Sequence, residues 1–241
     1  MTLLELLIAT LLTAILLLGI VQFASAAGAA RQLQDNQSQL QDQARSVARL
    51  IGDAISEAGF DPAPWNAAYA LDDVFAGSTD AVSTRGDRLV VRSWSDRNCF
   101  DNLNSVTAAD GRPAFYLRES AFDLNAEGQL TRSCRYGPSA SDLTTQVRRQ
   151  GKVPGVEGFQ LLFGIDADGD GNAERWARAG DWAAPGQVLG VRVGLLLRGA
   201  DPVAEPASVD HHVLDSVSSA PADGHLRLPL EFTVAVRGRT G

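Results

Sequence analysis

The beginning of the chain is apolar on every side of a helix. Residues 1–30 carry one charged side chain, Glu5, and no proline. A helix rises about 1.5 Å per residue, so the first twenty-four residues alone would span roughly 36 Å, enough to cross the hydrocarbon of a bilayer. The pattern therefore predicts a helix that lies in lipid or in another apolar surrounding.

Beyond residue 30 the apolar positions narrow to a stripe. They recur at three- and four-residue steps, apart from one seven-residue step across Gln37. The members of the stripe are Leu33, Leu40, Ala44, Val47, Ile51, Ile55 and Ala58. Gly59 permits a left-handed cap, and Pro62 and Pro64 prevent continuation. We expect one nearly continuous helix over residues 2–58, about 85 Å long, whose second half packs on a globular body. A short coiled coil is the alternative.

From residue 87 onward apolar residues recur at every second position, which indicates strands. The candidate strands, separated by turn-forming residues, are 88–94, 114–119, 129–136, 156–165, 174–178, 188–198 and 226–237. Pro229 indicates an edge or a bulge in the last strand, and we interpret residues 201–224 as a long surface loop. Strands that follow one helix without βαβ alternation predict the α+β class with an antiparallel sheet. Together with the long helix, this arrangement resembles the pilin fold. The expected parts are an apolar helix, its amphipathic continuation and a β-rich head, at residues 1–28, 29–60 and 61–241.

Composition supports a globular body and limits the choice of partners. Hydrophobic residues make up 45 %, charged residues 21 %, and the net charge is −8. We therefore expect no general attraction to the phosphate backbone of nucleic acids. Arg148, Arg149 and Lys152 form a short basic run that we interpret as a solvated loop.

The two cysteines, Cys99 and Cys134, both lie beyond the apolar segment. An even pair in an exported domain suggests one disulfide, and two buried free thiols are the alternative. Their spacing fits no zinc pattern. Closing a loop of about 35 residues would stabilise the fold by roughly 3–4 kcal/mol.

The residues of the apolar segment leave its purpose open. A cleavable secretory signal would use the small residues Ala24, Ser25 and Ala26 as its cleavage site, although the segment has no basic start. A generic single-span anchor would leave Glu5 without a role. A carboxylate inside an apolar span costs roughly 2.5–3.5 kcal/mol or more, so such a group usually has a partner.

The stretch Met1-Thr2-Leu3-Leu4-Glu5 resembles the mature N-terminus of type IV pilins and type II secretion pseudopilins. In that family a hydrophobic residue precedes Thr or Ser, two aliphatic residues and an acid. The resemblance implies that a prepilin peptidase cuts before Met1 and methylates the new amine. It also implies that Glu5 meets the N-terminal amine of a neighbouring subunit during filament assembly. The family most often has Phe where Met1 stands, and Met1 is either the mature first residue or an initiator.

A second resemblance lies in the body of the chain. Residues 155–160 (GVEGFQ), 164–171 (GIDADGDG) and 190–198 (GVRVGLLLR) resemble the C-terminal half of the PilW family of minor pilins. That family is in turn similar to the J-type pseudopilin of type II secretion. The resemblance implies a role in the small complex that primes pilus assembly and caps the filament tip.

The acidic turn over residues 166–174 is the best candidate for binding chemistry. Its residues at positions one, three, five, six and nine of an EF-hand-type calcium loop are Asp166, Asp168, Asp170, Gly171 and Glu174. The candidate Ca²⁺ ligands are Asp166, Asp168, Asp170, Asn172 and Glu174. The twelfth position is Ala177 instead of Glu, with Asp181 as a possible replacement, and helices do not flank the loop. The alternative is a glycine-rich turn whose acids face solvent.

Sequence patterns of enzymes are missing. The chain has no GxSxG, HExxH, Walker or dinucleotide-binding glycine pattern. His211 and His212 lie between two aspartates, but neighbouring side chains on extended backbone point apart, so we expect neither a metal site nor a catalytic triad there. The four tryptophans are scattered, and we expect them to anchor the core or surface loops.

We therefore expect a minor pilin, that is, a structural and interaction protein. The alternatives are a type II secretion pseudopilin, a calcium-dependent adhesive module on an ordinary anchor, and a secreted hydrolase with a cut signal. The resemblance implies as partners other minor pilins of the FimU, PilV and PilX kind, the major pilin, a PilY-type adhesin and the inner-membrane assembly machinery. It places the protein in the bacterial inner membrane, with its head in the periplasm, and later at the pilus tip.

Overall fold

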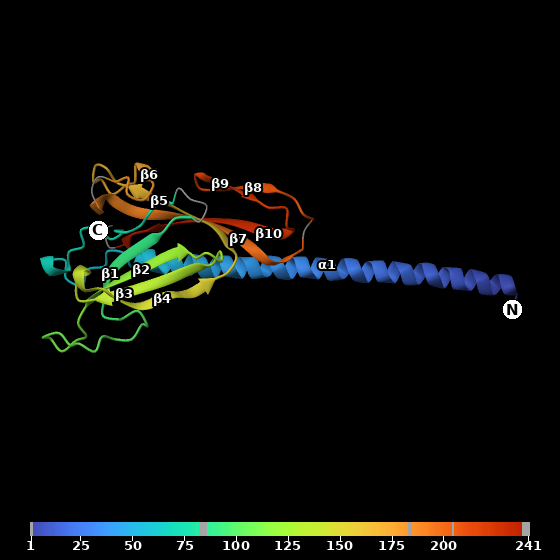
Figure 1. Ribbon diagram of the computed structural model, residues 1–241, viewed down its shortest axis with the longest axis horizontal. Coiled ribbons are helices and arrows are strands. Elements are labelled where there is room, and N and C mark those ends of the chain that lie inside the picture. Colours follow the sequence, from blue (N-terminus) through green and yellow to red (C-terminus); the bar gives the residue numbers. More distant parts are fainter. Residues whose placement is uncertain (1, 82–85, 183–184, 204, 238–241) are drawn as a thin grey trace.

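One helix, α1 (Leu3–Ser56), holds 54 of the 241 residues. The computed structural model describes residues 2–81, 86–182, 185–203 and 205–237. Figure 1 shows that the first half of α1 projects from a β-rich head, with the N-terminus at the far end. The second half of α1 lies between two sheets of that head. The predicted long helix packed on an antiparallel β body is thus confirmed.

Both ends of α1 follow from local chemistry. At the start, the Thr2 side chain accepts a hydrogen bond from the Glu5 backbone N–H, and the Glu5 carboxylate accepts one from the Thr2 N–H. This reciprocal capping box satisfies two of the four N–H groups that a helix start leaves without partners. At the other end Gly59 has a φ of +71°, as expected for a left-handed cap, and its N–H donates to the Arg92 carbonyl.

The stripe on the second half of α1 is buried as predicted. Its buried members are Leu40, Ala44, Val47, Ile51, Ile55 and Ala58. Leu33 is only half-buried, and the seven-residue step that follows it is filled by a polar residue, Asn36, which is buried. Asn36 therefore continues the buried face of α1 across the gap that the apolar stripe leaves between Leu33 and Leu40.

Asn36 meets strand β7 (Val188–Pro202) at a close approach. Its amide nitrogen donates to the Asp201 carbonyl at 3.3 Å, and a Cβ atom on Gly199 would overlap its side-chain oxygen. No partner for that oxygen is found among the described residues. Gly199 thus allows the helix and the strand to come together at this point.

The first sheet contains β1 (Leu89–Ser95), β2 (Tyr116–Leu124), β3 (Leu130–Gly137) and β4 (Thr144–Val153), in that order. The second contains β10 (His225–Ala235), β7, β5 (Val156–Ile165) and β6 (Arg175–Ala177), in that order. All pairs are antiparallel. Pro229 lies in β10, an edge strand, as its missing N–H predicts. Short 3₁₀ turns lie at Ala67–Tyr69, Ala140–Asp142 and Pro185–Gln187.

Three strands were not predicted. Strand β4 includes Arg148 and Arg149, which we expected in a solvated loop, and β8 (Val209–Val213) pairs with β9 (Ser216–Ala220) inside the expected loop of residues 201–224. Both predictions were wrong for the same reason. These strands lie at sheet edges or in a separate hairpin, so most of their side chains face solvent and show little apolar alternation.

Candidate functional site

The first half of α1 is an apolar rod without contacts to the head. Every residue from 3 to 26 is exposed. The large side chains on this surface are Leu3, Leu4, Leu6, Leu7, Ile8, Leu11, Leu12, Ile15, Leu16, Leu17, Leu18, Ile20, Val21 and Phe23. Among the described residues, α1 is the one helix long and apolar enough to cross a membrane. We call residues 3–26 the apolar rod; its surface must be covered by lipid or by other protein chains.

The carboxylate of Glu5 is part of the capping box in the isolated chain. Its Oε2 lies 2.8 Å from the Thr2 nitrogen. A negative charge in the first turn also interacts favourably with the helix dipole. Met1, which the resemblance makes the carrier of the free amine, lies outside the described residues. Contact between Glu5 and a neighbouring amine stays a prediction.

The acidic turn joins β5 to β6, so strands flank it instead of helices. Carboxylate oxygens of Asp166, Asp168, Asp170 and Glu174 all lie within 4.8 Å of one another. Gly169 and Gly171 have φ values of +80° and +87°. Both glycines donate their N–H groups to the buried Asp166 carboxylate, at 2.6 and 3.0 Å. The backbone turn thereby directs the carboxylates toward one point.

This donor set fits a hard cation. Calcium takes oxygen ligands at about 2.3–2.6 Å, so two ligands on opposite sides of the ion lie about 5 Å apart. Asn172 lies next to the cluster, because its amide nitrogen donates to the Asp170 carboxylate at 3.1 Å. Ala177, at the twelfth loop position, is buried in β6 and offers no side-chain ligand. Calcium binding by Asp166, Asp168, Asp170, Asn172 and Glu174 stays a prediction.

The predicted disulfide is present. Cys99 and Cys134 are bonded across 35 residues of sequence. The bond ties the loop that follows β1 to strand β3. Because Cys134 is fully buried and β3 is an inner strand, the loop is fixed to the interior of the first sheet.

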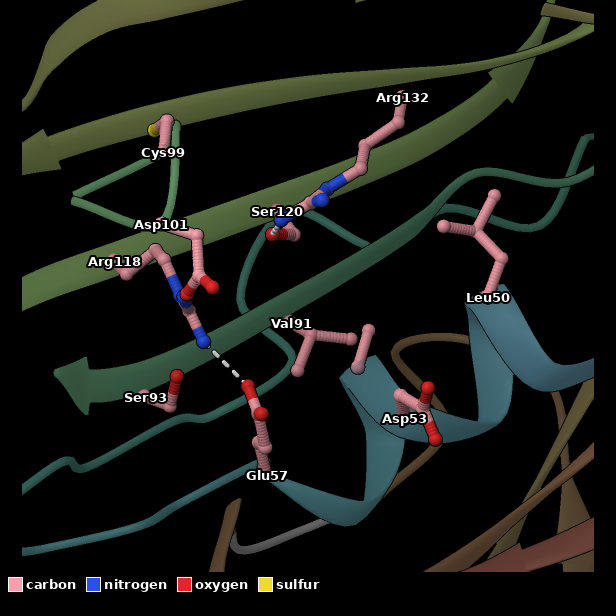
Figure 2. A pocket seen from close by; sticks show the side chains of 11 residues that line it. Leu50, Asp53, Glu57, Val91, Ser93, Cys99, Asp101, Arg118, Ser120 and Arg132 are labelled. Carbon is pink, nitrogen blue, oxygen red and sulfur yellow. Dashed lines mark hydrogen bonds and ion pairs between the residues drawn. The ribbon is translucent and has the colours of Figure 1, made fainter. Parts of the chain in front are cut away.

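The last turn of α1 faces the first sheet across a small cavity (Figure 2). The cavity measures about 210 Å³ and is surrounded by Asp53, Glu57, Asp101, Arg118 and Arg132. Arg118 pairs with Glu57 and so ties the end of the helix to β2. Burial, followed by the charge of Arg118, lowers the pKa of Arg132. The negative charges of three carboxylates nearly balance the positive charges of two guanidinium groups. We interpret this cavity as the joint between helix and sheet.

One buried carboxylate has no signal in the sequence beyond its place before a strand. Asp87 is 2 % exposed, and its two oxygens accept the N–H groups of Ala81 at 3.0 Å and Leu161 at 2.7 Å. Burial raises its pKa to about 6, with smaller increases from Asp80 and Asp215, although both hydrogen bonds lower it. Asp87 thus links the segment before β1 to strand β5.

The histidine pair and the tryptophans have different surroundings from one another. His211 and His212 are neighbours on β8, one half-buried and one exposed, and no metal cluster includes them among the described residues. Trp94 is buried against Tyr69, and Trp182 packs on Phe163. Trp65 is 87 % exposed, so it anchors no core.

The arrangement of a bare apolar rod, an α1 stripe and two antiparallel sheets is that of a pilin. The fold is similar to that of the type IV-like pilin TTHA1219 from Thermus thermophilus, with a TM-score of 0.57 and 15 % identity, over 84 % of this chain and 97 % of that chain. At this identity the likeness concerns the fold alone. No curated protein sequence matches the chain.

Residues 114–238 match the family described as PilW, type IV pilus-assembly protein W. The match covers more than half of the chain, which therefore belongs to the PilW family. It includes the acidic turn, Cys134 and most of both sheets. The family and the apolar rod are consistent with anchoring in the inner membrane and with a place in the pilus. The chain is thus a structural protein of the pilin kind, and the comparisons indicate no catalytic family.

Proposed function

We propose that this chain is a minor pilin that primes assembly of the type IV pilus and lies at or near the filament tip. The observation that carries the proposal is the apolar rod, which is exposed on all sides and has Glu5 as its one charged residue. A surface of this kind is stable in the bilayer before assembly and between the rods of other subunits afterwards.

Glu5 gives the rod its register in this proposal. Inside an apolar filament core the carboxylate would cost roughly 2.5–3.5 kcal/mol or more without a cationic partner. The N-terminal amine of the neighbouring subunit supplies that partner, so the subunits dock at one axial position. The capping box keeps the carboxylate at the helix start, where the neighbour's amine reaches it.

Two variants separate the charge of Glu5 from its capping role. Glu5→Gln keeps an oxygen that caps the helix but loses the charge, whereas Glu5→Val loses both. We expect both variants to retain a folded head in the membrane and to abolish or strongly reduce surface pili, measured by electron microscopy and by sheared-pilus yield. Normal piliation with Glu5→Gln would show that capping suffices and would overturn the mechanism.

The place at the tip and the partners need separate tests. We propose contacts with minor pilins of the FimU, PilV and PilX kind, the major pilin and a PilY-type adhesin, with the inner-membrane assembly machinery extracting the subunit from the membrane. Gold-labelled antibody against the head should bind at pilus ends and not along the shaft. Mass spectrometry of the mature protein should find a methylated Met1, whereas a start near Ala27 would indicate a cut signal.

The type II secretion pseudopilin is the second candidate, because the same fold and rod permit it. Deletion of the gene distinguishes the two functions. Loss of surface pili with normal secretion of exoproteins supports the pilus. Loss of secretion with normal piliation supports the secretion system.

A further inference from the structure

A second cavity lies at the end of the head away from the N-terminus. It measures about 400 Å³, within the range of small-molecule sites. Its walls come from the loop between β1 and β2, the adjoining ends of β2 and β3, and the turn that leads into β4. Figure 1 shows that this loop, drawn in green, projects at the end of the molecule opposite the apolar rod. We call this cavity the distal pocket.

One side of the distal pocket is aromatic and aliphatic. The rings of Tyr116 and Tyr136 lie with their centroids 5.3 Å apart and their planes at 33°. Across from the strands, the loop presents Leu103 and Val106, each about half exposed. Together these side chains provide a surface for the C–H face of a flat ligand.

The rest of the lining is polar but almost without charge. The lining side chains that carry amides or hydroxyl groups, besides the tyrosines, are Asn98, Asn104, Ser105, Thr144 and Gln146. Asp142 is the one ionisable carboxylate among the described lining residues, and they include no arginine, lysine or histidine. Groups of this kind donate and accept hydrogen bonds to neutral hydroxyl groups, whereas phosphates need cationic groups.

The pocket is held open by interactions that do not need a ligand. The disulfide fixes Cys99 to β3, two residues before Tyr136. The Gln146 side-chain oxygen accepts the Cys99 N–H at 3.0 Å, and the Asn98 oxygen accepts the Phe100 N–H at 2.9 Å. The amide nitrogens of Gln146 and Asn98 have no partner among the described residues. They are therefore available to a ligand without any rearrangement of the loop.

Tyr136 adds a neutral aromatic ring to the wall of the pocket. Burial raises its pKa to about 12, so the phenol is neutral at physiological pH. Within the described part of the chain its hydroxyl group makes no regular hydrogen bond, and the Asn104 side chain is its polar neighbour. This hydroxyl oxygen is itself buried, so Tyr136 contributes its ring to the wall and not its hydroxyl group to a ligand.

We propose that the distal pocket binds a neutral carbohydrate of one or two sugar rings. A sugar ring combines C–H faces, which pack on Tyr116, Leu103 and Val106, with hydroxyl groups that pair with the amides and hydroxyl groups around them. The distal pocket is open to solvent and has walls from three segments, so a sugar ring can enter it from the surface. The proposal concerns the head alone and is independent of where the subunit lies in a filament.

Saturation-transfer NMR on the full chain tests the proposal, in a detergent whose head group is not a sugar. The probes are glucose, galactose, N-acetylglucosamine and lactose. We expect saturable binding of at least one of them, with a dissociation constant of the order of millimolar, and discrimination between the epimers glucose and galactose. The absence of saturable binding for all four sugars would overturn the proposal. So would saturable binding of an uncharged Ser-Asn-Gly peptide without binding of any sugar.

Neighbouring residues on one edge strand provide a matched pair of variants. Thr144 lines the pocket, whereas Thr145, equally exposed on β4, points to the opposite face. Thr144→Arg should fill the pocket and weaken sugar binding by roughly tenfold or more, and Thr145→Arg should leave it unchanged. Equal affinities in the two variants would assign the signal to another surface.

A second pair keeps the test decisive if an arginine disturbs folding. Tyr116→Leu and Tyr69→Leu each remove one ring from an aromatic pair, but only Tyr116 lines the pocket. We expect weaker binding for Tyr116→Leu alone, with both variants melting cooperatively. Binding that survives in Tyr116→Leu would contradict the proposed aromatic wall.

Discussion

The two halves of α1 have the same secondary structure and opposite surroundings. From residue 3 to 26 every side chain is exposed, whereas from residue 36 to 55 one face is buried against β7, β10 and the first sheet. The head therefore supplies the apolar environment of the second half, and lipid or other subunits must supply that of the first. One helix can therefore have one half in the core of its own molecule and the other half in surroundings that lipid or other chains must provide.

The largest effect should come from matched truncations in the two halves. Ile51 is 0 % exposed and Ile15 is 60 % exposed. Ile51→Ala should lower the free energy of unfolding of the head by about 4 kcal/mol, because it leaves a cavity between helix and sheets. Ile15→Ala should change it by less than about 0.5 kcal/mol. All four tryptophans lie in the head, so denaturant unfolding followed by tryptophan fluorescence reports on the head alone.

Similar losses of unfolding free energy in the two variants would contradict this prediction, because they would mean that the rod contributes to the stability of the head.

The amount of surface pili measures the role of the rod instead. Larger polar changes in the rod, such as Ile15→Asn, should impair assembly while the melting of the head stays as in the wild type.

An intermediate effect should follow from pH, which acts on the packed region through Asp87. The pKa of Asp87 in the folded state is about 6, above the ordinary value of 3.8. Between these two pH values the folded state therefore holds a proton that the unfolded state has lost. The contribution of Asp87 to the free energy of unfolding is then highest below pH 4. It falls by about 3 kcal/mol in total as pH rises toward 6. Asp87→Asn should remove this decline from the curve of unfolding free energy against pH.

Other carboxylates titrate in the same range, so the difference between variant and wild type is the quantity to measure. Hydrogen bonds from Arg227 hold the pKa of Asp223 well below its usual range, and that group contributes in the opposite direction. Asp110→Asn, an exposed aspartate, is the matched control. A difference curve without slope between pH 4 and 6 would show that burial of Asp87 has no effect on its titration.

The smallest effect should come from calcium, which also concerns the head alone. If calcium is present at about ten times its dissociation constant for the acidic turn, it stabilises the head by about 1.4 kcal/mol, or roughly 3–6 °C in melting temperature. EDTA should reverse the shift, and Asp168→Asn should remove it while Asp142→Asn preserves it. Equal melting curves in calcium and in EDTA would rule out the site and leave a glycine-rich turn.

Apolar period predicted much of this architecture. It located both ends of α1 to within two residues. It also located most of the strands that lie inside the two sheets, because burial of one face imposes a period on the sequence. The burial of Asn36 was not predicted, because a polar side chain continues the apolar stripe at a point where Gly199 leaves room for it. The edge strand β4 and the hairpin of β8 and β9 were not predicted, because their side chains mostly face solvent and so lack an apolar period.

The candidate sites divide in the same way. The acidic turn and the two cysteines stand out as residue types at fixed spacing. The distal pocket and Asp87 do not, since their members come from segments up to 74 residues apart that only folding brings together.

The local patterns predict that this chain contains a long helix, whose apolar half carries one acid and whose striped half joins a β-rich head. These features depend on local period and on single residues, which the order of the chain records directly. Tertiary packing determines which polar groups are buried, which amides converge on the distal pocket and how two sheets enclose the second half of α1. Those outcomes depend on contacts between distant segments, and each such contact is set by the packing of the whole head.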